Sequence, residues 1–309
     1  MALNDPSSTG LSRHREFYFP DGSVIIIIDA TAFKVHQSVL SRHSDVFAGM
    51  WDVPQPKGIS DIDGCPTVEL QDHVSDFADT LKAIYDSFHF DNLPPNADLT
   101  TLLTFLSGIL RITTKYNMQQ LRNKCIALLC QKFPSTLSGC DAVIAQQYLY
   151  TPSPIVRLIP LARETNIPEV LPWAYYICTQ MSIPDLLANP VLSWRDKALC
   201  LAGKERLWEA RKTTTHPFLL DLSRSAQCSG GSCATGLRRP TANWRESEDQ
   251  RSLAHPIEPY RDWTALGTCA WCTGVYQAQH RVGREKVWEQ LPSFYELGSW
   301  DEIRKDQNC

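Results

Sequence analysis

The sequence lacks long apolar runs and clusters of basic residues, and each absence excludes a class of protein. Apolar runs such as residues 24–28 are far shorter than the ~20 residues needed to cross a bilayer. The polar N-terminus carries no apolar segment typical of a secretory signal. Lys and Arg form no run longer than a pair such as Arg238 and Arg239, and the net charge is −4. We therefore expect a cytoplasmic or nuclear protein that binds neither membranes nor nucleic acid.

Catalytic signatures are missing as well. The chain has no Gly-x-Ser-x-Gly elbow, no Gly-x-Gly-x-x-Gly loop, no P-loop and no His-Glu-x-x-His helix. Its eight histidines are scattered, and its carboxylates fall on what are expected to be exposed helix faces. The sequence therefore predicts a protein that is not an enzyme.

Hydrophobic patterning divides the chain into four regions. Residues 1–14 are polar and are expected to be disordered. Residues 15–133 mix short strands and amphipathic helices, which is typical of an α/β (α+β) domain. Residues 134–222 show mainly helical patterns, and residues 223–309 look loop-rich.

Local signals place the elements of the first half. Residues 23–29 and 31–36 predict a β-hairpin, residues 37–50 two short helices, and residues 67–72 a further strand. N-caps are expected at Ser44, Ser75, Asp98 and Ser193. The C-terminal aromatic residues are expected to dock on the helical half, although they could instead anchor a partner; they are Trp288, Phe294, Tyr295 and Trp300.

Residues 16 to about 130 resemble a BTB/POZ domain. The first strand GSVIIII, the segment TAFKVHQSVLSRHSDVFAGMW, and TVELQD followed by FADTLKAIYDSF carry the resemblance. The family's motif positions correspond to Phe33, His36, Leu40, Ser44, Phe47 and Met50. The long loop before the third strand and the extended C-terminal half are similar to expanded BTB proteins of fungi. The resemblance makes His36 a structural residue that holds the first helix.

The resemblance implies a protein-interaction adaptor or scaffold without catalysis. The resemblance implies two kinds of partner, a second copy of the chain and a cullin-type ubiquitin ligase scaffold. The interaction residues it implies are Phe47, Met50 and Trp51. Ligase adaptors often carry a hydrophobic-x-Glu motif in the next loop, and residues 52–66 contain no such triplet. Dimerising BTB proteins often start the first strand with Asp, where this chain has Ser23.

Two cysteine pairs predict a metal site. Cys228 and Cys233 form a C-x4-C pair, Cys269 and Cys272 form a C-x2-C pair, and 35 residues separate the pairs. Four thiolates suit a closed tetrahedral zinc site of structural type, with His216 or His280 as a substitute ligand. The alternative is four free cysteines in an irregular region. A zinc-containing nuclear transcriptional regulator is the alternative function.

Five other cysteines fall in helical patterns and are expected in or near the core; they are Cys125, Cys130, Cys140, Cys178 and Cys200.

Overall fold

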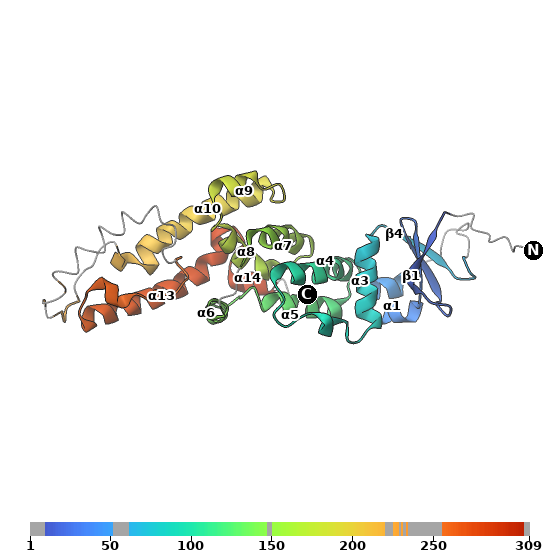
Figure 1. The fold of residues 1–309 in the computed structure, drawn as a ribbon, viewed down its shortest axis with the longest axis horizontal. Coiled ribbons are helices and arrows are strands. Elements are labelled where there is room, and N and C mark those ends of the chain that lie inside the picture. The colour runs from blue at the N-terminus through green and yellow to red at the C-terminus, as the bar shows by residue number, and fades with distance from the viewer. Residues whose placement is uncertain are drawn as a thin grey trace, which may run out of the picture. The chain divides into compact units, whose positions relative to one another are not determined.

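A computed structural model describes residues 10–51, 62–146, 150–219, 225–228, 230, 233 and 255–305 (Figure 1). The chain divides into two compact units. The first comprises Met1–Leu129 and Glu164–Asn166, and the second comprises Cys130–Arg163 and Ile167–Cys309. We describe each unit separately.

A four-stranded sheet forms the strand-containing part of the first unit. Its strands are β1 (Ser12–Tyr18), β2 (Val24–Ile28), β3 (Thr31–Val35) and β4 (Thr67–Leu70), in the spatial order β1-β3-β2-β4. The hairpin prediction is confirmed, because β2 and β3 are antiparallel with Val24 opposite Val35. Asp29 takes the left-handed conformation, with φ 51°, that the tight turn between them requires. Strands β1 and β4 join the two sides of this hairpin in parallel.

Strand β1 corrects the predicted disordered N-terminus, because it begins at Ser12 rather than after residue 14. The strand is at the edge of the sheet and most of its residues are exposed, with only Phe17 buried. Its pairing with β3 therefore comes from backbone hydrogen bonds and leaves no apolar alternation in the sequence. The predicted disorder of residues 1–9 lies outside the described residues.

Helices cover the sheet and extend the first unit. They are α1 (Gln37–His43), α2 (Asp45–Met50), α3 (Val74–Tyr85), η1 (His89–Asn92), α4 (Leu99–Lys115) and α5 (Gln119–Cys130). Two predicted N-caps are confirmed: Ser44 Oγ accepts from the amide of Phe47 at 3.0 Å, and Asp98 Oδ1 accepts from that of Thr101 at 2.7 Å. The Ser75 cap is wrong. Helix α3 starts two residues earlier than that cap predicts, with His73 as its N-cap and no side-chain capping bond.

Close packing joins α3 to α4, and a glycine permits it. A Cβ at Gly108 would lie 2.9 Å from the Asp76 Cα, which is closer than an ordinary contact. On the sheet side, Phe77 of α3 meets Phe33 of β3 edge to face, with ring centroids 5.2 Å apart. Both side chains are fully buried. These contacts link the sheet to the two longest amphipathic helices that lie wholly in this unit.

The second unit is built from helices. They are α6 (Leu137–Ala145), α7 (Pro152–Glu164), η2 (Pro168–Val170), α8 (Leu171–Cys178), α9 (Ile183–Ala188), α10 (Trp194–Ala210), the π-helical turn η3 (Arg211–Thr215), η4 (Pro217–Leu219), η6 (Trp263–Leu266), α13 (Ala270–Phe294) and α14 (Trp300–Lys305). The long helices α10 and α13 lie side by side (Figure 1). The predicted cap of α10 is confirmed, since Ser193 Oγ accepts from the Asp196 amide at 3.1 Å.

Helix α13 corrects the prediction of a loop-rich C-terminal region. It spans 25 residues, and its buried face includes Cys272, Tyr276, His280 and Arg284. Since polar His280 and Arg284 occupy two of these positions, the hydrophobic period of a helix is not visible in the sequence. Arg284 is held there by an ion pair with Asp141 and by donating its Nε to the Ile257 carbonyl at 2.6 Å.

The aromatic tail docks within the second unit, as expected. Trp288, Tyr295 and Trp300 are at most 2% exposed. The rings of Trp288 and Trp300 stack with centroids 5.4 Å apart, and Tyr295 stacks on Tyr175 at 5.1 Å. Four of the five cysteines expected in the core are fully buried, and Cys130 is half-buried.

Candidate functional sites

The predicted interaction residues lie at the end of α2, and their exposure differs. Phe47 is fully buried and stacks on Tyr116, with ring centroids 4.6 Å apart. Met50 and Trp51 are half-buried, and Trp51 Nε1 donates to Ser41 Oγ at 2.8 Å. Val46, which the sequence did not single out, is 41% exposed. Phe47 therefore lies in the core, while the other three side chains expose atoms to solvent.

His36 is part of the fold. Its backbone amide donates to the Tyr85 hydroxyl at 3.1 Å, and its Nδ1 lies 3.1 Å from the same oxygen. A hydroxyl that accepts from the amide can donate its proton to Nδ1, which leaves Nε2–H facing Asp21 Oδ2 at 3.4 Å. The ring thus ties the start of α1 to α3, in line with the expected structural role.

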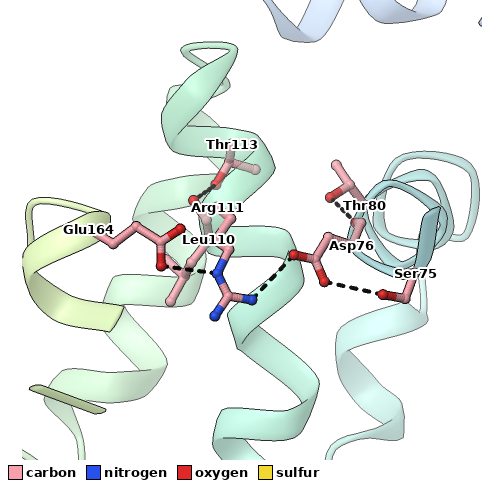
Figure 2. Close-up of polar contacts among 7 residues, drawn as sticks. All are labelled: Ser75, Asp76, Thr80, Leu110, Arg111, Thr113 and Glu164. Atoms are coloured by element: carbon pink, nitrogen blue, oxygen red, sulfur yellow. Dashed lines mark hydrogen bonds and ion pairs between the residues drawn. The ribbon is translucent and has the colours of Figure 1, made fainter. Parts of the chain in front are cut away.

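A charged pocket of about 630 Å³ lies in the first unit, and sequence reasoning missed it. At its centre Arg111 of α4 bridges two carboxylates, as Figure 2 shows: Nε donates to Glu164 at 3.1 Å and Nη1 to Asp76 at 3.2 Å. Burial opposes the charged form, but these two partners raise the pKa of Arg111 above its usual value. The residues come from positions 76, 111 and 164, so no local spacing could have indicated the network.

A second carboxylate of this pocket, Asp72, is also paired. Asp72 accepts from Lys115 Nζ at 2.7 Å and from the Tyr116 hydroxyl at 2.5 Å. Burial, followed by the bond to Asp72, raises the pKa of Tyr116. The lining contains five carboxylates, two cationic side chains and one histidine. This excess of negative charge favours a basic group of a partner over an anion.

The two cysteine pairs converge in the second unit. The sulfurs of Cys228, Cys233, Cys269 and Cys272 all lie within 4.8 Å of one another. Cys269 is the N-cap of α13 and Cys272 lies in its first turn, so the C-x2-C pair sits on a helix start rather than in a loop. Gly230, between the other two cysteines, takes φ 82°, a left-handed conformation that favours glycine.

The protein environment differs between these thiols. The backbone amide of Cys272 donates to the Cys269 sulfur and lowers the pKa of Cys269 to about 7. Burial raises the pKa of Cys272 to about 12. The Cys269 amide donates to Cys233 Sγ at 3.0 Å, and the Ser225 amide to Cys272 Sγ at 3.4 Å.

Neither histidine considered as a substitute ligand belongs to this cluster. His280 Nδ1 lies 2.8 Å from the Thr215 carbonyl and donates to it, and Nε2 accepts from the Tyr260 amide at 2.9 Å. Both ring nitrogens are thus used within the fold. His216 is buried beside them, with the ring centroids 4.6 Å apart, and its Nδ1 lies 2.8 Å from the Thr215 hydroxyl.

The small sheet with its paired short helices and following helices defines the first unit as an α+β domain. Residues 21–133 match the model of the BTB/POZ domain family, and the chain is therefore a BTB/POZ domain-containing protein. Domains of this family are protein–protein interaction modules. No curated protein matches the chain. Of the helices in the described part of the chain, none is long and apolar enough to span a membrane.

Proposed function

We propose that the protein is an adaptor that binds a cullin-type ubiquitin ligase scaffold through its BTB domain and a second protein through its C-terminal unit. The proposal assigns no reaction to the chain and places it in the cytoplasm or nucleus. The observation that carries it is the BTB/POZ match over residues 21–133, combined with accessible apolar atoms at the end of α2.

The end of α2 offers a compact apolar surface. Val46, Met50 and Trp51 expose atoms there, and Phe47 packs directly beneath them between Tyr116 and Trp51. A rigid aromatic support of this kind lowers the entropy cost of ordering surface side chains on binding. Because the chain has no hydrophobic-x-Glu triplet in residues 52–66, we expect this surface to supply the main contacts with the scaffold.

The second unit presents candidate contacts for the other partner. Trp271 and Val282 of α13 are 62% and 58% exposed. Since they are eleven residues apart, close to three helical turns, they lie on the same side of the helix. Exposed large apolar side chains that share one face are typical of interaction surfaces.

Binding to a cullin N-terminal domain tests the proposal. We expect a micromolar or tighter complex with the full chain, and at least a tenfold loss for Met50→Glu, because the new carboxylate would be desolvated in the interface. Phe88→Glu is the matched control: Phe88 belongs to the same domain and is 72% exposed, away from α2 in the sequence. A folded wild-type protein that does not bind, or equal losses in both variants, would contradict the proposal.

Self-association is the other partner class for this domain. Ser23 occupies the position where dimerising relatives hold Asp, and its hydroxyl accepts from the Gln37 amide at 2.9 Å. The Ser23 hydroxyl therefore pairs with the first backbone amide of α1 and does not supply a charge to a pocket. Sedimentation of the chain alone, in the same samples, separates a monomer that binds the scaffold from a self-associating domain.

The cysteine cluster is the observation that supports the alternative, a zinc-containing nuclear regulator. Nucleic-acid binding would require positive charge near it, yet α13 carries Arg281, Glu285, Lys286 and Glu289 in mixed order. Retention on a DNA column that falls steeply with salt would favour the regulator over the adaptor.

A further inference from the structure

We propose that Cys228, Cys233, Cys269 and Cys272 bind one structural zinc ion. The sulfur atoms lie within 4.8 Å of one another, and those of Cys228 and Cys269 are 4.0 Å apart. A tetrahedral site with Zn–S bonds of about 2.3 Å places its sulfurs ~3.8 Å apart. The observed arrangement is therefore close to that of a zinc site. All four thiols are free rather than disulfide-bonded.

The convergence of these thiols is not a consequence of local sequence. One pair precedes α13 by some 35 residues and the other forms its start, so two separate segments must meet to bring the sulfurs together. Among the residues that the structure describes, these four cysteines form the group of metal-ligand type, and the other cysteines do not gather in this way. Four cysteine sulfurs gathered this closely are typical of a zinc or iron site.

The surroundings are suited to thiolates bound to a metal. The amides of Cys269 and Ser225 point at the sulfurs of Cys233 and Cys272, at 3.0 and 3.4 Å. Such second-shell donors stabilise coordinated thiolates and orient them. Cys269 and Cys272 also lie at the N-terminus of a 25-residue helix, where the helix dipole favours negative charge.

The cluster is embedded in a hydrophobic core of the second unit. Cys233 and Cys272 are 1% exposed and pack with Phe218, Leu266 and Tyr276. Tyr260 and Trp263 cover the same core. Since four protein ligands complete the coordination of zinc, no position remains for substrate, and the ion would serve structure rather than catalysis.

The proposed ion would join the segment around Cys228 and Cys233 to the first turn of α13. Ligation by four thiolates supplies folding free energy, because the unfolded chain holds no preformed metal site. Loss of the ion should release this segment and loosen the aromatic core around Phe218, while the BTB domain remains folded.

Metal analysis of the full chain, purified without chelator, tests the site. We expect about one zinc per chain in the wild type, and less than about a tenth of that in Cys269→Ser/Cys272→Ser. Cys130→Ser is the matched control, because it removes a half-buried thiol of the same unit outside the cluster, and it should retain the ion. Cobalt added to metal-free protein should give the strong visible absorption of a tetrahedral thiolate site.

The outcomes are decisive even if the double variant folds poorly, because the wild type is measured by itself. Wild-type protein that holds neither zinc nor cobalt would overturn the proposal. So would iron in place of zinc, or zinc retained equally by the double variant. Scaffold binding by the BTB domain is a separate readout, so failure of this site and failure of the adaptor proposal can be distinguished.

Discussion

Replacing Phe47 by Ala tests whether the end of α2 is built on a core side chain. Phe47 is fully buried. Its ring centroid lies 4.6 Å from that of Tyr116 and 5.9 Å from that of Trp51. Its amide also donates to Ser44 Oγ, which caps α2. Truncating a buried Phe typically costs about 3–5 kcal/mol, because the transfer free energy is lost and a cavity remains.

We therefore expect Phe47→Ala to lower the free energy of unfolding of the BTB domain by about 3–5 kcal/mol, a large part of the 5–15 kcal/mol typical of a domain. Hydrogen exchange read by mass spectrometry is the suitable assay, because it reports each unit separately. Exchange should accelerate in peptides of α2 and α4 and stay unchanged in α13.

Val46→Ala is the control, since Val46 is 41% exposed and neighbours Phe47 in the same helix. It should change stability by less than about 0.5 kcal/mol. If Phe47→Ala were as mild as this control and yet abolished partner binding, Phe47 would be an interface residue and the core assignment would be refuted.

Two further predictions concern packing and pH. Gly108→Ala should destabilise the first unit by about 1–3 kcal/mol in urea unfolding, because the new Cβ would meet the Asp76 Cα at 2.9 Å; an unchanged midpoint would show that α3 and α4 can separate at no cost. Burial lowers the pKa of His255 to about 3. The unfolded state then binds a proton near pH 6.5 that the folded state does not, so this contribution to stability is complete above pH 6.5. It is lost by about 1.4 kcal/mol per pH unit as the pH falls towards 3. Since the His255 ring packs edge to face on Tyr176, His255→Phe should keep the packing and reduce the acid dependence of the second unit by the share of one histidine; an unaltered slope in thermal melts would contradict this.

The sequence predicted the BTB domain well because its signals are local. The hairpin of β2 and β3 follows from β-branched runs, and the caps at Ser44 and Asp98 follow from short polar signals before apolar periods. Edge strand β1 could not be predicted this way, since its partners are backbone groups of β3 and its own side chains are mostly exposed.

Helix α13 shows a second limit of sequence reasoning. Its buried positions include His280 and Arg284, and each is tolerated only because distant groups receive its hydrogen bonds. The cysteine pairs were recognisable from spacing, but their convergence depends on how α13 begins. The pocket around Arg111 left no signal, because Asp76 and Glu164 are 35 and 53 residues away in sequence.

We propose that the end of α2 is the surface by which this BTB protein binds its scaffold. Hydrogen exchange of the full chain, with and without a cullin N-terminal domain, would locate the contact. We predict slower exchange in peptides that span Val46, Met50 and Trp51, and no change in α13. Unchanged exchange across the BTB domain at saturating partner, or protection confined to the second unit, would contradict the account.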